Sequence, residues 1–239
     1  MKKVPLLEIF GPTIQGEGMV IGQKTMFLRT GGCDYRCSWC DSAFTWDGSQ
    51  KPDLMEAQEI VTQLEAKGGS LFSHVTISGG NPALHDGLGE VVRLLQEKGI
   101  QTAVETQGSF WKEWMTDIDE VTISPKPPSS GMQTNWEQLD TYIHRLKGRQ
   151  KKQVSLKVVI FDETDLSYAA EVHERYPEVE MFLQTGNDEW STAENQWLLT
   201  HLLNRYEWLV EQALHSERLN DVKVLPQLHT LLWGNKQGV

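Results

Sequence analysis

The sequence predicts an α/β fold on a mostly parallel sheet, in the form of a complete or partial TIM-like barrel; a doubly wound sheet is the alternative. Two observations carry this prediction. Short segments rich in β-branched residues alternate with helical segments of ten or more residues, which is the pattern of βαβ units. Several predicted strands also end in polar or glycine-rich segments, where barrel enzymes place their chemistry. The chain has 239 residues, a length that suits a single domain.

Seven segments are predicted as strands because they are rich in Val, Ile, Thr and Phe and end at Ser, Gly, Pro or Asp. In chain order they are Thr25–Thr30, His74–Ser78, Gln101–Glu105, Glu120–Ser124, Val154–Ile160, Glu180–Gln184 and Asp221–Leu225. Five helices are predicted from the apolar spacing between the strands. They are Glu56–Lys67, Asp86–Lys98, Asn135–Leu146, Glu163–Arg175 and Thr192–His215, with Asp165 and Thr192 as candidate caps.

Polar or glycine-rich segments follow four of the predicted strands, at Ser78–Pro82, Glu105–Gly108, Ser124–Lys126 and Gln184–Asn187. One such segment would be an ordinary turn, but four of them after four parallel strands favour a site at one end of the sheet. We expect Lys126–Gly131 to be a loop over that site. The basic run Gly148–Gln153 is expected to be a solvated turn.

The charge balance bears on possible partners. With 22 basic and 33 acidic residues the net charge is −11, which disfavours binding to nucleic-acid backbones or to anionic membranes. No apolar stretch approaches the roughly 18 residues of a spanning helix. The amino-terminal apolar run is interrupted by Pro5 and Glu8 and is too short for a signal peptide. We therefore expect a cytoplasmic protein with no nucleic-acid or membrane partner.

All three cysteines fall in one short segment directly after a predicted strand. Cys33, Cys37 and Cys40 have the spacing C-x3-C-x2-C, and an odd, clustered set does not form a disulfide framework. Structural zinc prefers four closed ligands. An iron–sulfur cubane also usually takes four cysteines, so three would leave one iron open for a substrate or a cofactor. Zinc and iron–sulfur chemistry both remain open from spacing alone.

This cysteine motif, with Trp39 before its last cysteine, resembles that of the radical S-adenosylmethionine (SAM) superfamily. The resemblance implies a partial TIM-like barrel, one [4Fe-4S] cluster on the three cysteines, and SAM bound to the open iron as the source of a 5′-deoxyadenosyl radical. It also implies that Gly80 and Asn81 lie at the SAM amino group, with Asn81 where the superfamily usually has Glu. The residues implied to bind SAM are Trp39, Asp41, Gly80, Asn81, Glu105, Ser124, Lys126 and Gln184.

A second motif, Phe10–Gly18, is expected to be a glycine-rich polar loop in which Glu17 suits the N–H/NH2 edge of an aminopyrimidinone. Alone it would be a polar turn. Together with the cysteine motif it resembles the 7-carboxy-7-deazaguanine synthase family, and matching segments extend over nearly the whole chain. They are Phe27–Arg29, Cys40–Ser42, Glu105–Gly108, Ser124–Pro128 and Pro226–His229.

The family resemblance implies a lyase of queuosine biosynthesis. It would convert 6-carboxy-5,6,7,8-tetrahydropterin into 7-carboxy-7-deazaguanine by radical ring contraction with loss of ammonia, regenerating SAM. Mg2+ on Ser42, a flavodoxin or ferredoxin reductant, and a homodimer are also implied. The amino- and carboxyl-terminal segments are expected to complete the substrate site. The implied substrate-binding residues are Ile14, Gln15, Gly16, Glu17, Arg29, Ser78, Gln227 and His229.

Two other functions stay open at this point. One is a glycyl-radical-enzyme activase of the same superfamily, although the segment Ile14–Glu17 differs from the one that activases carry. The other is a zinc-binding interaction module. For single residues, Arg29 has an alternative interpretation as a salt bridge at a strand end, and His229 as a structural histidine.

Overall fold

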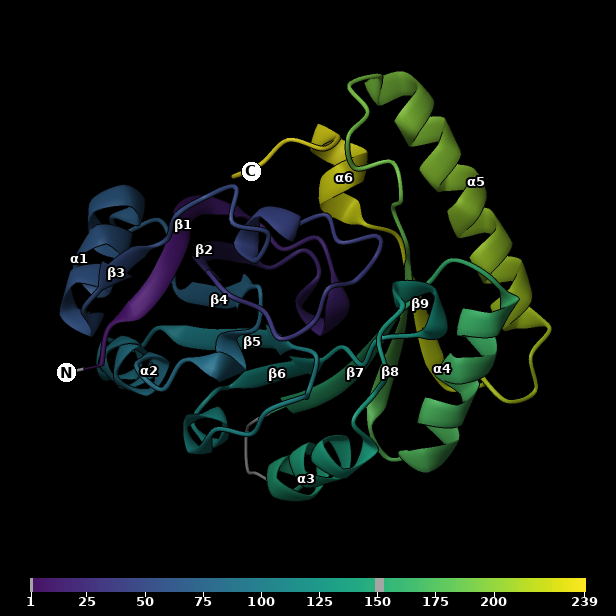
Figure 1. Cartoon of the computed structure of the whole chain (residues 1–239), viewed down its shortest axis with the longest axis horizontal. Helices are drawn as coiled ribbons and strands as arrows, with labels where there is room; N and C mark the ends of the chain where they lie inside the picture. Colours follow the sequence, from purple (N-terminus) through teal and green to yellow (C-terminus); the bar gives the residue numbers. More distant parts are fainter. Residues whose placement is uncertain (1, 149–152) are drawn as a thin grey trace.

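The computed structural model describes residues 2–148 and 153–239, so most of the predicted basic turn at Gly148–Gln153 lies outside the described residues. These residues build one sheet of nine strands (Figure 1), in the order β3-β1-β2-β4-β5-β6-β7-β8-β9. The strands are β1 (Val4–Ile14), β2 (Lys24–Thr30), β3 (Asp53–Met55), β4 (His74–Gly79), β5 (Gln101–Thr106), β6 (Glu120–Ile123), β7 (Gln153–Ile160), β8 (Glu180–Thr185) and β9 (Val222–Leu225).

The strand order decides between the two predicted architectures. In the part of the sheet ordered β2-β4-β5-β6-β7-β8-β9 each pair of neighbouring strands is parallel, and the strands lie side by side in chain order. The reversal of order that a doubly wound sheet requires is absent from this series. The edge strands β3 and β9 do not pair with each other. The fold is therefore an open, partial barrel, and the predicted fold class is confirmed.

Helices cover the outside of this curved sheet (Figure 1). All seven predicted strands and all five predicted helices are present, with ends shifted by up to three residues. The helices are α1 (Ala57–Gly68), α2 (Leu88–Glu97), α3 (Trp136–Leu146), α4 (Glu163–Arg175), α5 (Asn195–Leu214) and a short α6 (Leu228–Trp233) that was not predicted. None of the described helices is long and apolar enough to cross a membrane.

The amino-terminal prediction was partly wrong. The segment from Phe10 to Ile14 is not a loop but the end of β1, which pairs antiparallel with β2 and β3. Gly11 and Pro12 interrupt its strand pattern, so the sequence did not predict a strand there. Register shifts in the pairing with β2 allow the strand to bend there. Only the residues after Ile14 form the loop that was expected.

The two predicted caps were also wrong. The side chain of Asp162 caps α4 by accepting from the backbone N–H groups of Thr164 and Asp165. Asp165 is buried in the first turn and accepts instead from the N–H groups of Ser129 and Phe161. Helix α5 begins after Glu194, so Thr192 lies outside it. For α4 the predicted start at Glu163 was right, but the cap is the preceding residue and not Asp165; for α5 the helix starts three residues later than predicted.

Side chains on the inner strands alternate between an apolar outer face and a more polar inner face. In β7, Leu156, Val158 and Ile160 belong to the apolar core, whereas Lys157 and Val159 line a cavity on the other side. In a strand, successive side chains point to opposite faces. Arg29, Ser78 and Glu105 also point to the inner face of their strands and line the same cavity. The alternation of side chains along the strands therefore gives the sheet a polar inner face.

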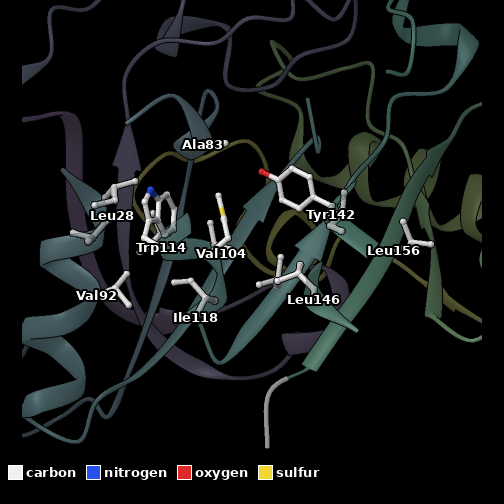
Figure 2. Packing of buried hydrophobic residues seen from close by; sticks show 14 of the residues in the cluster. Leu28, Ala83, Val92, Val104, Trp114, Ile118, Tyr142, Leu146 and Leu156 are labelled. Carbon is white, nitrogen blue, oxygen red and sulfur yellow. The ribbon is translucent and has the colours of Figure 1, made fainter. Parts of the chain in front are cut away.

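The apolar core lies between the sheet and its helices. Figure 2 shows Val92 of α2, Val104 of β5 and Ile118 packed around Trp114, with Tyr142 of α3 nearby. Each of these side chains except Trp114 is at most 1% exposed, and full burial of such a group contributes about 1.5–3 kcal/mol. This core fixes the positions of the strands on the outer face of the sheet, so the inner face is left to line the cavity.

Candidate active site

A cavity of ≈ 270 Å³ opens at the carboxyl ends of the parallel strands. Of the twenty predicted site residues, all except Asn81 and Gln184 line it. Strand ends, the cysteine loop, and both terminal segments of the chain contribute to its wall. The predicted residues on the wall are Ile14, Gln15, Gly16, Glu17, Arg29, Cys33, Cys37, Trp39, Cys40, Asp41, Ser42, Ser78, Gly80, Glu105, Ser124, Lys126, Gln227 and His229.

The cysteine loop after β2 is anchored on both sides by backbone hydrogen bonds. Gly32 donates its N–H to the Thr45 carbonyl (2.6 Å) and accepts from the N–H of Asn81 (2.8 Å). On the other side, the N–H of Ser38 donates to the Ser130 carbonyl (3.0 Å). The segment Lys126–Gly131 therefore packs directly on this loop, which agrees with its prediction as a loop over the site.

The three cysteines are free thiols that face the same cavity. Burial raises the pKa of each thiol, that of Cys40 to about 11. The surrounding residues also supply N–H groups to sulfur: Gln107 Nε2 lies 3.5 Å from Cys33 Sγ, and Trp46 Nε1 lies 3.5 Å from Cys40 Sγ. Such N–H groups stabilise thiolates and tune iron–sulfur clusters. Three convergent thiols with sulfur-directed donors fit a three-cysteine cluster.

Gly80 is at the point where β4 approaches the cysteine loop most closely. A Cβ atom added there would overlap the carbonyl oxygen of Gly32 and lie 3.1 Å from Cys33 Cβ. Only glycine permits this approach. Beyond Gly80, Lys126 donates to the Ser124 hydroxyl (3.0 Å), and its ammonium lies 5.9 Å from the ring of Trp39. This side of the cavity combines exposed backbone, a hydroxyl, a cation and an indole.

A buried lysine joins two of the predicted carboxylates. The ammonium of Lys157 forms ion pairs with both Glu17 and Glu105, and its side chain is only 3% exposed. Burial alone would raise the pKa of Glu17, but the charges of Lys157 and His229 lower it to about 2. Burial would likewise lower the pKa of Lys157, whereas the two carboxylates raise it. Lys157 and Glu17 are therefore both charged at neutral pH.

The carboxyl-terminal segment closes the cavity against the amino-terminal loop. The Gln227 amide donates to Glu17 Oε1 (2.8 Å), and the N–H of Leu228 donates to the Gly16 carbonyl (3.0 Å). His229 packs against Gly16 so closely that a Cβ atom there would overlap its ring. Two segments that are 210 residues apart in the chain thus form one wall.

Arg29 and Ser42 lie on a third wall. Arg29 Nε donates to Glu8 (2.6 Å), and its Nη1 donates to the Ser42 hydroxyl (3.1 Å), which in turn donates to Asp41 (3.0 Å). The salt bridge considered for Arg29 is therefore present, although the side chain also lines the cavity. One donor atom each of Asp41, Glu17 and His229 lie within 4.8 Å of one another, a spacing that could hold a metal ion.

Asn81 and Gln184 are the two predicted site residues that the structure does not bring to the cavity. Both are fully buried. Gln184 donates to the Leu225 carbonyl (3.3 Å), and its Oε1 has no partner among the described residues. Asn81 is hydrogen-bonded within the protein. The family resemblance implied a SAM contact for both residues, but the sequence does not show that their side chains are buried in the folded chain.

Lys157 and Trp46 line the cavity and were not predicted. The lysine stands in the middle of an otherwise apolar strand, between Leu156 and Val158, which was a usable signal because lysine is rarely buried unless paired. Trp46 follows the cysteine motif by six residues and carries no such signal. The segment 234–239 also contributes to the wall.

The fold and the cysteine-lined cavity define a radical SAM enzyme. The family described as the radical SAM superfamily matches residues 27–159. The 7-carboxy-7-deazaguanine synthases of Bacillus cereus and Bacillus subtilis are 58% and 59% identical to the chain. Those alignments cover 100% of this chain and 100% and 99% of the relatives. The chain therefore belongs to the 7-carboxy-7-deazaguanine synthase family.

A solved structure agrees with this fold. The crystal structure of QueE from Escherichia coli superposes with a TM-score of 0.69 over 95% of each chain, at 21% sequence identity. Membership of the superfamily implies a [4Fe-4S] cluster and SAM as cofactors, and the convergent thiols fit the cluster. Neither the glycyl-radical activase nor the zinc module agrees with these relatives.

Proposed function

We propose that this chain catalyses the conversion of 6-carboxy-5,6,7,8-tetrahydropterin into 7-carboxy-7-deazaguanine, with loss of ammonia. The observation that carries the proposal is that one cavity is lined both by the three cysteines and by Ile14–Glu17. The first set suits the radical cofactors, and the second suits a pterin edge. Substrate and cofactors would therefore meet in one cavity. We also propose that residues 1–239 act as a single domain.

When bound, the cofactors would supply the radical chemistry, the cluster as the electron donor and SAM as the source of the 5′-deoxyadenosyl radical. The chain's own residues would position SAM. The backbone at Gly80 suits its amino group, and Trp39 suits its adenine by stacking. Ser124, Lys126 and Glu105 suit the polar parts of the molecule. Asp41, which also lines the cavity, is the last residue proposed to contact SAM.

On the substrate side, Glu17 would accept from the N–H/NH2 edge of the pterin ring. Its carboxylate already accepts from Lys157 and Gln227, but a carboxylate offers about four lone-pair sites. Because its pKa is lowered to about 2, it remains an acceptor throughout the neutral range. Arg29 would bind an oxygen of the substrate. Further substrate contacts are proposed for the other residues of this set, which are Ile14, Gln15, Gly16, Ser78, Gln227 and His229.

Mg2+ is proposed to bind Ser42. The hydroxyl of Ser42 lies 3.0 Å from the Asp41 carboxylate, and Mg2+ commonly takes one or two protein ligands and completes its octahedron with water and substrate oxygens. A divalent cation here would lie beside Arg29, where the substrate carboxylate is proposed to sit. That arrangement would hold the substrate by its acidic end.

A flavodoxin or ferredoxin is proposed to deliver the electron near Arg36. This exposed guanidinium lies 4.8 Å from the ring of Trp46, whose Nε1 reaches Cys40 Sγ.

A homodimer is proposed as well. Leu199, Leu203 and Leu214 are exposed and share one face of α5, and a second copy would cover them. Light scattering of the purified chain tests the dimer.

The decisive experiment is an anaerobic assay of the reconstituted chain with 6-carboxytetrahydropterin, SAM, Mg2+ and dithionite, followed by mass spectrometry. We expect 7-carboxy-7-deazaguanine in an amount exceeding the enzyme, with SAM not consumed. About four irons and acid-labile sulfide per chain should accompany this activity. Stoichiometric zinc, or turnover that requires a protein substrate, would refute the proposal.

A further inference from the structure

The side chain of Asn81 is completely used by hydrogen bonds inside the protein. It is 0% exposed. Its Oδ1 accepts from the N–H of Ala83 (3.1 Å) and from the hydroxyl of Thr106 (2.8 Å). Its Nδ2 donates to Asp34 Oδ1 (2.8 Å) and to the hydroxyl of Ser109 (3.0 Å). A side-chain amide has two donors and two acceptor lone pairs, so no capacity is left for a cofactor.

The orientation of this amide is determined by its partners. The backbone N–H of Ala83 can only donate, so Oδ1 must face it. The carboxylate of Asp34 can only accept, so Nδ2 must face that side. Each end of the amide therefore has one partner of fixed polarity, and no flipped arrangement satisfies both.

Asp34 connects this amide to the cysteine loop. It directly follows Cys33, and its Oδ1 accepts both from Asn81 and from Gln107 Nε2 (2.7 Å). Gln107 also lies 3.5 Å from Cys33 Sγ. The backbone repeats the connection, because the N–H of Asn81 donates to the Gly32 carbonyl (2.8 Å). Both residues that flank Cys33 are thus tied to position 81.

From these contacts we propose that Asn81 is a positioning residue for the cysteine loop and not a side-chain ligand of SAM, and that Asn81 and Asp34 form a matched pair. The pair needs one donor and one acceptor. A glutamate or aspartate at position 81 would place a second carboxylate against Asp34, and like charges at this distance repel. The uncharged amide is therefore required by its neighbour in the loop. This inference rests on the proposed cluster site.

A swap of the two side chains tests the pair in the full-length, anaerobically reconstituted chain at pH 8. The variants are Asn81→Asp, Asp34→Asn and the double variant that carries both. In Asn81→Asp two carboxylates face each other. In the double variant the carboxylate at position 81 is again opposite an amide, and it keeps acceptors for Ala83 and Thr106. The Gln107 amide, which donates to Asp34 in the wild type, has to turn its oxygen towards the new amide at position 34, and a side-chain amide can present either end. Asn135→Asp is the matched control, because that side chain caps α3 by accepting from Gln138 and faces no carboxylate among the described contacts.

Two quantities are measured: the rate at which iron is lost to a chelator, and the Kd of SAM by equilibrium dialysis. We expect Asn81→Asp to lose iron about tenfold faster, the scale of one lost hydrogen bond to a charged group. The double variant should return to within about threefold of the wild type, and the control should not change. SAM should bind the Asn81→Asp chain no more tightly than it binds the wild type.

Two results would overturn the inference: tighter binding of SAM by Asn81→Asp, or no slowing of iron loss in the double variant. If Asn81 contacted the SAM ammonium, a carboxylate at position 81 would attract it and tighten SAM binding. If the double variant lost iron as fast as Asn81→Asp, the two residues would not be a matched pair. A wild-type chain that retains no cluster would instead refute the proposed function, so the two failures are distinguishable. Rescue in the double variant also separates misfolding of the single variant from a wrong inference.

Discussion

Replacing Lys157 by methionine removes the cation that holds Glu17 and Glu105 together. The three side chains are 3%, 15% and 24% exposed, so water screens their charges poorly. Methionine keeps most of the aliphatic length of lysine, and the main change is the loss of the ammonium. Two carboxylates would then share a largely dry site without their ion-pair partner, and we expect the folded chain to become less stable at neutral pH.

The size of the loss follows from Glu17. Burial raises its pKa, but Lys157 and then His229 lower it from 4.5 to about 2. At about 1.36 kcal/mol per pKa unit, this difference corresponds to about 3.4 kcal/mol. Breaking a buried pair by removing one partner typically costs about 3–5 kcal/mol. Because His229 supplies part of the shift, we expect Lys157→Met to lower the free energy of unfolding by about 3 kcal/mol.

The loss should depend on pH in one direction. A lowered pKa stabilises the folded chain fully above the ordinary pKa, and that stabilisation disappears as the pH falls towards the folded value. In Lys157→Met the unpaired, buried Glu17 has a raised pKa and takes up a proton more readily. The difference in stability between wild type and variant should therefore be largest at pH 7 and narrow below about pH 5.

Urea denaturation of the metal-free chain, followed by circular dichroism at pH 7 and pH 4.5, measures this difference without any contribution from the cofactors. Lys223→Met is the control, because Lys223 is 60% exposed and its ion pair with Glu180 should contribute little. Adding Glu17→Gln to Lys157→Met should recover part of the loss. The reasoning is refuted if Lys157→Met unfolds at the same urea concentration as Lys223→Met.

Four further outcomes are expected. Glu17→Gln should raise the Kd of the pterin about tenfold or more, as for a lost charged hydrogen bond, and leave that of SAM nearly unchanged; equal losses would argue against a substrate role. Cys37→Ala should abolish SAM cleavage without changing the circular dichroism spectrum, and retained cleavage would contradict the cluster assignment. Gly16→Ala should weaken pterin binding because its methyl group displaces His229, an effect that calorimetry would detect and that an unchanged Kd would exclude. Ser42→Ala should increase the Mg2+ concentration needed for half-maximal turnover, and an unaltered Mg2+ titration would remove Ser42 as a ligand.

Local pattern predicted the elements of this fold well because the signals are short-range. The strand Val154–Ile160 is apolar and β-branched, and helix 163–175 follows it with helical spacing. Strand β1 was missed because Gly11 and Pro12 interrupt its pattern, and the pairing with β2 that makes it a strand is not local. The caps failed for another reason, since a cap is defined by the hydrogen bonds that its side chain makes to the first helical turn, and Asp165 bonds instead to Ser129 and Phe161.

Much of the site was also predictable, because the carboxyl ends of parallel strands meet at one edge of a sheet. Once the strands were assigned, Ser78, Glu105 and Ser124 had to lie near the cysteines. Gly16 and His229 are different, because their contact joins the amino-terminal loop to the carboxyl-terminal segment. The resemblance to a family implied that both residues lie at the substrate site, and no spacing in the chain predicts their contact.

By itself, the sequence determined the α/β class with its mostly parallel sheet, the three-thiol motif and the residue types available to the site, because these depend on order along the chain; the strand order of the folded chain then decided for the open barrel over a doubly wound sheet. Only the tertiary structure decided which side chains face the cavity and which are consumed inside the protein. The position of Lys157 within an apolar strand signals that it has a buried partner, but only the structure shows that its partners are the two carboxylates Glu17 and Glu105 on the cavity wall. Asn81 follows a predicted site glycine, yet all its hydrogen bonds are internal. Burial and partner choice arise from contacts between distant segments, so only the packed chain contains them.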